Sequence, residues 1–140
     1  MVDVYDSATR RRVMQAIKSS DTKPEVIIRR IVRSLGFPGY RLHRKDIPGK
    51  PDIAFIGRRL AIFVNGCFWH GHSCQRGRRV PKTNMAYWRQ KIEGNKARDK
   101  AHHKELSMLG WRSLVIWECE LRDLDAVERK LFKFLSGPRP

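Results

Sequence analysis

The stretch PDIAFIGRRLAIFV, residues 51–64, contains two short apolar runs separated by Gly-Arg-Arg. Apolar runs joined by a short polar turn predict a hairpin of two strands, here over residues 52–56 and 60–64. Outward from this hairpin, YRLHRK at 40–45 predicts a short strand and WRSLVIWE at 111–118 a buried one. The sequence therefore predicts a sheet of three or four strands.

A helix is expected before these strands. Thr22, Pro24 and Glu25 have the arrangement of an N-cap, a first-turn proline and a capping-box acid, and Gly36 ends the helix. The apolar stripe of this helix consists of Ile27, Ile28, Ile31, Val32 and Leu35.

Three more helices are expected: a basic one over residues 7–19, a long one over 84–109 that Gly94 interrupts and Gly110 closes, and a last one over 124–135. The apolar face of the last helix consists of Leu124, Val127, Leu131, Phe134 and Leu135. Helices alternating with strands predict a mixed α/β fold. The length suits a single domain, residues 1–140, with an N-terminal arm over 1–20 and a core over 21–140.

The composition points to a nucleic-acid partner. Thirty Lys and Arg against 14 Asp and Glu give a formal net charge of +16, and such an excess favours phosphate backbones over other partners. A merely soluble basic surface or a ribosomal-type protein is the alternative. The sequence has no apolar stretch of the ~20 residues that span a bilayer and no apolar signal-peptide core. Three cysteines favour metal binding in a reducing cytoplasm over disulfides.

The cysteines lie in a pattern typical of zinc binding. Cys67, His72 and Cys74 form a compact C-x4-H-x-C run, and Cys119 follows the predicted strand at 111–118. Structural zinc takes four Cys or His ligands at the corners of a tetrahedron. His70 competes with His72 for the histidine position, and the spacing alone does not choose between them. The alternative is that the cysteines are buried small apolar side chains.

Asp52 directly precedes the first strand of the hairpin. A carboxylate at this position can hold Mg²⁺ beside a phosphate, although a turn residue before a strand is an equal interpretation. The layout of Pro-Asp followed by a strand pair resembles the restriction-type nuclease core. In that core the second strand ends with an acidic residue, a spacer and a lysine, whereas here it ends with Val64, Asn65 and Gly66.

Several segments together resemble the very short patch repair endonucleases of bacteria. These are VYDSATRRRVMQAI, PGKPD, NGCFWHGHSC, YWRQKIEGNKARD and LGWRSLVIWEC, and the colinear resemblance runs from about Asp3 to Leu121. It implies a restriction-endonuclease-like fold with a structural zinc site. It also implies Mg²⁺-dependent nicking of one DNA strand beside the thymine of a T·G mismatch, the product of 5-methylcytosine deamination.

The resemblance also assigns roles to catalytic residues. It implies that Asp52 binds Mg²⁺ together with the backbone carbonyl of Val64, and that His70 activates the attacking water. Glu25 and Asp99 match acidic positions that orient metal-bound waters or the catalytic histidine. For Glu25 a capping role is the alternative, and for Asp99 it is a surface ion pair.

Assigning His70 to catalysis leaves one histidine for zinc. The resemblance implies the zinc ligands Cys67, His72, Cys74 and Cys119. The departure from the family that matters is at Asn65, where well-known members carry a second catalytic histidine; Gly71, where a histidine is common, removes no assigned ligand. An amide can hydrogen-bond a water or a phosphate, but it cannot accept a proton near neutral pH. The reaction is then expected to depend on His70 alone, or to be slower.

Four apolar side chains are expected to insert into DNA. By resemblance these are Phe68, Trp69, Trp88 and, from the minor-groove side, Met14. Unstacking a base step costs a few kcal/mol and costs least at a mismatch, which is a physical route to selecting T·G. Burial in the core is the alternative, and it is the interpretation adopted for Trp111 and Trp117. Basic residues in 10–12, 76–82 and 89–100 are expected to bind phosphates.

The expected partner is double-stranded DNA with a T·G mismatch, bound by a monomer in the bacterial cytoplasm at the nucleoid, with mismatch-repair proteins as candidate partners. Two alternatives stay open. One is a related restriction-type endonuclease that cuts intact sites. The other is a zinc-stabilised DNA-binding protein whose activity is reduced by Asn65.

Overall fold

A mixed four-stranded sheet forms the centre of residues 22–137, the part of the chain that the computed structural model describes. The strands are β1 (Arg41–Leu42), β2 (Ile53–Phe55), β3 (Leu60–Asn65) and β4 (Arg112–Trp117), in the order β1-β2-β3-β4. β1, β2 and β3 pair antiparallel, and β3 and β4 pair parallel. The predicted hairpin is confirmed, while the expected strand at 40–45 has only two residues.

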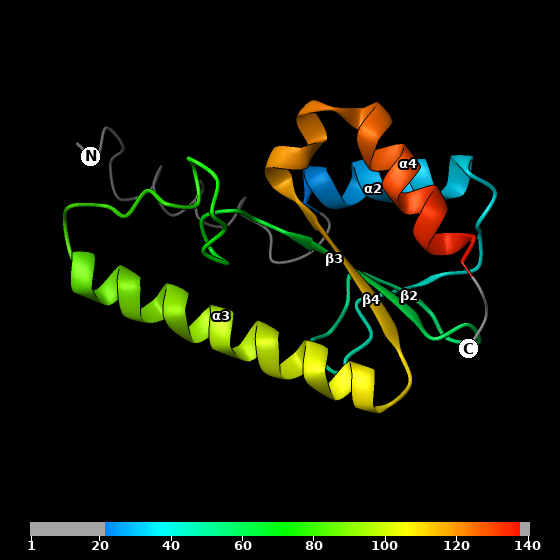
Figure 1. Ribbon diagram of the computed structural model, residues 1–140, viewed down its shortest axis with the longest axis horizontal. Helices are drawn as coiled ribbons and strands as arrows, with labels where there is room; N and C mark the ends of the chain where they lie inside the picture. The colour runs from blue at the N-terminus through cyan, green and yellow to red at the C-terminus, as the bar shows by residue number, and fades with distance from the viewer. Residues whose placement is uncertain (1–21, 138–140) are drawn as a thin grey trace, which may run out of the picture.

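Helices cover both faces of the sheet (Figure 1). α2 (Lys23–Ser34) and α4 (Leu124–Leu135) pack against each other on one face, and α3 (Met85–Met108) lies on the other. A short 3₁₀ helix, η1 (Glu118–Arg122), connects β4 to α4. α3 is the crossover that makes the parallel pairing of β3 with β4 geometrically feasible. The fold class of a mixed sheet flanked by helices is confirmed.

The alternation of side chains along β2 and β3 divides the core into two layers. Ile53, Phe55, Leu60 and Ile62 pack with α2 and α4, whereas Ala54, Ala61 and Phe63 pack with Leu106 of α3. Successive side chains of a strand point to opposite faces, so a strand buried on both faces is apolar throughout. This explains the continuous apolar runs of the hairpin.

The two amphipathic helices largely follow their predicted stripes. Ile28 and Val32 of α2 are fully buried, as are Leu131 and Leu135 of α4. The exception is Leu124, which is 47% exposed. It is the first residue of α4, and its predicted place on the buried face is therefore wrong.

The long helix also differs from its prediction. α3 is continuous from Met85 to Met108 and passes through Gly94 without a break. A single glycine costs an exposed helix about 1 kcal/mol, and the surrounding Arg, Gln, Lys, Glu and Ala residues are strong helix formers. The predicted interruption at Gly94 is therefore wrong.

The expected helix at 7–19, the arm over 1–20 and Met14 lie outside the described residues. Among residues 22–137, no helix is both long and apolar enough to cross a membrane.

Candidate functional site

The parallel pair of β3 and β4 brings two distant cysteines together. Asn65 at the end of β3 is directly opposite Trp117 at the end of β4. Two residues beyond these ends lie Cys67, in a turn, and Cys119, in η1. The register thus explains why residues 52 positions apart in sequence meet at one edge of the sheet.

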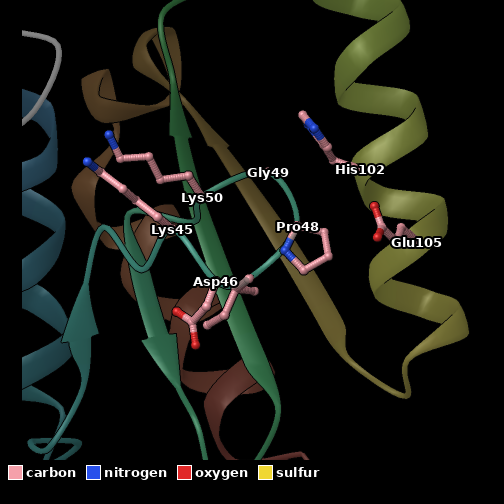
Figure 2. A pocket seen from close by; sticks show the side chains of 8 residues that line it. Lys45, Asp46, Pro48, Gly49, Lys50, His102 and Glu105 are labelled. Atoms are coloured by element: carbon pink, nitrogen blue, oxygen red, sulfur yellow. The ribbon is translucent and has the colours of Figure 1, made fainter.

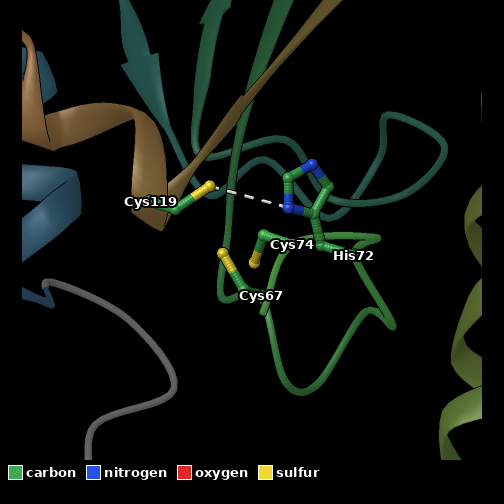
Figure 3. A group of neighbouring side chains, drawn as sticks. All are labelled: Cys67, His72, Cys74 and Cys119. Atoms are coloured by element: carbon green, nitrogen blue, oxygen red, sulfur yellow. Dashed lines mark hydrogen bonds between the residues drawn. The ribbon is translucent and has the colours of Figure 1, made fainter. Parts of the chain in front are cut away.

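The four predicted zinc ligands form one cluster (Figure 3). Their ligand atoms, from Cys67, His72, Cys74 and Cys119, all lie within 4.8 Å of one another. His72 Nδ1 is 3.6 Å from Cys119 Sγ, so it is His72 rather than His70 that joins the cysteines. Three thiols and one imidazole are a donor set typical of structural zinc, and the residues present fit that ion.

The surroundings change the acidity of two of these thiols. Burial raises the pKa of Cys67 to about 12, while the amide of Gly77, which donates to Cys74 Sγ over 3.4 Å, lowers the pKa of Cys74 to about 6. Gly77 has no space for a side chain, because a Cβ there would lie 2.1 Å from the His72 carbonyl oxygen. The loop is therefore folded tightly around the cysteine that ionises most readily.

Trp117 lies on this cluster and not in either core layer. Its ring stacks on the imidazole of His72, with centroids 4.2 Å apart and an interplanar angle of 20°. The same indole is 6.3 Å from the ring of His70. The sequence offered no signal for this position beyond an aromatic at the end of a strand. Trp111, by contrast, packs against the core layer beneath α3.

Asp52 lies where β2 begins, beside the end of β3. Its Oδ2 accepts a hydrogen bond of 2.6 Å from the amide of Val64. A residue in a strand directs its N–H and C=O to the same side, so the Val64 carbonyl also faces the Asp52 side of the strand. The predicted pair of oxygen ligands for Mg²⁺ is thus on one side of β3.

Burial is the main influence on the Asp52 carboxyl group. Burial raises the pKa of Asp52, the Val64 amide lowers it and the nearby Glu25 carboxylate raises it, and together they bring this pKa to about 7. Burial destabilises the ionised form of this carboxyl group, and a bound cation in place of the proton stabilises that form. These surroundings therefore favour a role for Asp52 as a ligand of a divalent metal ion over a role as a turn residue alone.

Glu25 is 4% exposed and points to the same region. Its amide donates to Thr22 Oγ1 over 3.5 Å, so Thr22 caps α2. Its carboxylate accepts hydrogen bonds from Arg29 at 3.3 Å and from His43 at 3.2 Å. The helix start thus places a buried carboxylate at the site as well as beginning α2.

His43 is a site residue that the sequence did not reveal. Its Nε2 lies between two carboxylates, 3.2 Å from Glu25 Oε2 and 3.9 Å from Asp52 Oδ1. The three side chains form a second group suited to a metal, with ligand atoms within 4.8 Å of one another. A lone histidine after a two-residue strand is a weak signal, because its partners come from two other elements.

His70 and Asp99 form a pair that links the loop after β3 to α3. His70 Nδ1 and Asp99 Oδ2 are 2.6 Å apart. With Nδ1–H donating to the carboxylate, Nε2 is the ring nitrogen that can accept a proton. Asn65, the predicted substitute for a second histidine, is buried at the end of β3.

The predicted DNA-inserting aromatics of the described region pack edge to face with one another. Phe68 lies 5.1 Å from Trp69 and 5.6 Å from Trp88, and the two tryptophans are 5.7 Å apart. Trp69 is 43% exposed, and Tyr87, which contacts Trp88, is 56% exposed. Lys91 Nζ lies over the Trp69 ring. These rings belong to neither core layer and form a partly exposed aromatic cluster.

The same loop and α3 carry many exposed basic side chains. These are Arg76, Arg78, Arg79, Lys82, Arg89, Lys91, Lys96, Arg98, Lys100 and Lys104. A separate pocket between the turn at 45–50 and α3 contains Lys45 and Lys50, whose side chains extend to the same side, with His102 opposite (Figure 2). Positive charge is therefore available on the α3 side of the sheet.

Comparison with known proteins gives the family. The sequence matches the family model described as DNA mismatch endonuclease Vsr over residues 2–76. It is 48% identical to the type II nicking enzyme V.XorIIP of Xanthomonas oryzae pv. oryzae, across 97% of this chain and 98% of that one. It is 40% identical to the DNA mismatch endonuclease Vsr of Escherichia coli K12, across 98% and 90%.

A solved structure agrees with the fold. The catalytic domain of the homing endonuclease I-Bth0305I superposes with a TM-score of 0.55 at 26% identity, covering 83% of this chain and 96% of the domain. Sequence and structure therefore both lead to nucleases, as the resemblance of the motifs predicted. The chain belongs to the Vsr DNA mismatch endonuclease family.

Proposed function

We propose that this chain is a Mg²⁺-dependent endonuclease that nicks one DNA strand beside the thymine of a T·G mismatch arising from 5-methylcytosine deamination. The observation that carries the proposal is the loop after β3. Phe68 and Trp69, which belong to the partly exposed aromatic cluster, directly precede His70, which is hydrogen-bonded to Asp99. Mismatch sensing and hydrolysis are thus assigned to three consecutive residues.

The proposed hydrolysis uses the residues around the end of β3. Asp52 and the Val64 carbonyl would hold Mg²⁺, which when bound supplies positive charge to the reacting phosphodiester. His70 accepts the proton of the attacking water at Nε2, and Asp99 fixes its ring through Nδ1. Glu25, buried beside Asp52, orients water at the same place.

The Cys67–His72–Cys74–Cys119 cluster has a structural role in this proposal. It would bind Zn²⁺ with all four positions filled by protein, as structural zinc sites do. The cluster joins the ends of β3 and β4 and holds the loop that carries Trp69 and His70. The zinc therefore contributes to folding and not to chemistry.

DNA binding divides into two parts. The exposed basic side chains contact phosphates and supply affinity that does not depend on sequence. The aromatic cluster inserts where base pairing is weakest. We propose a single domain, residues 1–140, acting as a monomer, with the segment outside the described residues adding the predicted Met14 contact.

The test is nicking of labelled duplexes that differ only in one T·G or T·A pair, with varied flanking sequence, in Mg²⁺ and in EDTA. Asp52→Ala and His70→Ala should each nearly abolish nicking and keep mismatch binding. Asp125→Asn, at an exposed acid in the first turn of α4, is the matched control and should behave like the parent.

Two other results would replace the proposal. Equal cleavage of T·G and T·A duplexes would indicate a restriction-type endonuclease. Mismatch binding with no nick in any divalent ion would indicate a DNA-binding protein, with Asn65 as the first residue to examine.

A further inference from the structure

His43 has no part in the proposed hydrolysis, yet its imidazole lies at the centre of a buried ionic cluster. Its Nε2 is 3.2 Å from Glu25 Oε2 and 3.9 Å from Asp52 Oδ1. The Glu25 side chain is 5% exposed and the His43 side chain 19%. Arg29 Nη2 lies 3.3 Å from Glu25 Oε2 in the same cluster.

The two oxygens of Asp52 are not equivalent. Oδ2 accepts the Val64 amide at 2.6 Å, so Oδ1 is the oxygen that can bind a metal without losing that bond. Oδ1 is also the oxygen that His43 Nε2 approaches. A metal ion on Oδ1 is therefore placed next to the imidazole.

The spacing suits two ligands of one ion. Ligands about 2.1 Å from an octahedral ion are about 3 Å apart when adjacent and about 4.2 Å apart when opposite. The 3.2 Å and 3.9 Å separations around His43 Nε2 fall near that range. All three ligand atoms lie within 4.8 Å of one another, so small side-chain rotations suffice to enclose an ion.

We propose that His43 is a nitrogen ligand of the divalent ion held by Asp52, and that it makes this centre favour Mn²⁺ over Mg²⁺ more than an all-oxygen site does. The inference rests on the metal centre of the proposed function. Magnesium prefers oxygen ligands, whereas imidazole suits ions further along the first transition row. Asp52, Glu25 and the Val64 carbonyl supply only oxygen, so His43 sets the preference.

A different role for His43 predicts a different result. If the imidazole only donates a hydrogen bond to Glu25, it positions a carboxylate and treats every divalent ion alike. Its removal would then weaken Mn²⁺ and Mg²⁺ binding by the same factor. The ratio of the two affinities, and not either affinity alone, separates a ligand from a positioning residue.

The experiment uses the full-length, zinc-loaded protein without DNA, so that the cysteine cluster is filled. Electron paramagnetic resonance measures Mn²⁺ binding, and Mg²⁺ competition gives the affinity ratio. Pulsed measurements detect nitrogen bound to Mn²⁺, and ¹⁵N-histidine labelling of the unmutated protein identifies that nitrogen as imidazole. The labelled protein needs no variant, so a folding defect cannot hide the answer.

Three variants complete the test. His43→Gln, which offers an oxygen in place of nitrogen, should remove the nitrogen signal and lower Mn²⁺ affinity by about tenfold or more, with a smaller loss for Mg²⁺. His103→Gln, a histidine of α3 that contacts Ser113, is the matched control and should change neither value. Asp52→Asn should remove binding of both ions.

The outcomes are distinct. A nitrogen signal and affinity ratio that survive His43→Gln, with binding still dependent on Asp52, would overturn the role of His43 and leave the proposed metal centre intact. Mn²⁺ binding that is unchanged by Asp52→Asn, or the absence of any Mn²⁺ binding, would overturn the proposed metal centre as well. Loss of the nitrogen signal together with the change in ratio would establish His43 as a ligand.

Discussion

At the scale of single residues, Asp52 is subject to opposing influences. Burial raises its pKa to about 7, and the Val64 amide opposes that rise. Because the folded-state pKa lies above the ordinary value of 3.8, the metal-free fold holds a proton that the unfolded chain releases. The contribution of this carboxyl to stability is therefore full below about pH 4 and is lost as pH rises through about 7.

This predicts that Mg²⁺ binding depends on pH. With the pKa of Asp52 near 7, protons compete for its carboxylate, so Mg²⁺ affinity should be about tenfold lower at pH 6 than at pH 8. The increase in Tm caused by Mg²⁺ should be correspondingly larger at pH 8. Calorimetry and thermal melts check both, and Asp52→Asn should abolish the response at either pH. An equal Mg²⁺ effect at both pH values would contradict the assignment.

Asn65 permits a gain-of-function test. It occupies a buried position at the end of β3, next to the site, where relatives by resemblance carry a second histidine. Asn65→His should raise the single-turnover nicking rate, by up to the roughly 10²–10⁴-fold that general acid–base groups contribute. Combined with Asp52→Ala, the change should have no effect. An unchanged rate in a folded protein would show that His70 needs no such helper.

At the scale of elements, the segment between β3 and α3 carries six of the assigned residues, from Cys67 to Cys74, and α3 supports it. Asn95 of α3 donates to the Trp69 carbonyl over 2.8 Å, and Asp99 bonds His70. α3 buries only Ile92 and Leu106 of its 24 residues. Most of the helix is therefore free to support this loop and present basic side chains.

The aromatic cluster is tested by Trp69→Ala. Because Trp69 is 43% exposed, its loss should change Tm little while lowering the T·G over T·A affinity ratio more than the affinity for T·A DNA. Phe132→Ala, at an exposed aromatic of α4, should change neither. Fluorescence anisotropy with both duplexes measures the two affinities, and a thermal melt measures Tm. A destabilised variant whose folded fraction keeps full discrimination would mean that Trp69 packs as a core residue.

Elements were easier to predict from sequence than contacts between them. Short apolar runs and capped helices predicted the hairpin, α2 and α4, because these patterns are local. The continuity of α3 through Gly94 was missed because neighbouring helix formers outweigh one glycine. His43 was missed because Glu25 and Asp52 approach it only after α2, β1 and β2 have packed. The Cys and His cluster could be predicted because three of its four residues lie within eight positions.

At the scale of the whole molecule, the Cys67–His72–Cys74–Cys119 cluster joins the ends of the parallel strands β3 and β4. Cys67 follows β3 and Cys119 follows β4. Cys119→Ser should therefore lower zinc content and Tm together, since structural zinc contributes folding free energy directly. Elemental analysis and melting measure the two. Ser107→Ala, in the exposed last turn of α3, is a neutral control. A well-folded parent protein without zinc would contradict the assignment.

The net charge of +16 makes binding sensitive to salt. Each lost phosphate contact should reduce the magnitude of the negative slope of log affinity against log salt by about one. The double change Arg78→Ala with Arg79→Ala should therefore reduce the magnitude of that slope by up to about two. It should leave the ratio of T·G to T·A affinity unchanged. Arg129→Ala with Lys133→Ala, on α4, should leave the slope unchanged. A large loss of discrimination in the loop variant would show that these arginines read the mismatch itself.

Two hydrogen bonds join α3 to the loop after β3. Asn95 and Asp99 are one helical turn apart, and they hold two adjacent residues, Trp69 and His70. If the Trp69 indole inserts into DNA as proposed, we expect a shift of this residue to displace the neighbouring His70 as well. We expect a poorly seated duplex to be bound yet cut slowly, so that it dissociates first. Fidelity would then be kinetic as well as thermodynamic, and mutations of this loop would exchange speed for accuracy.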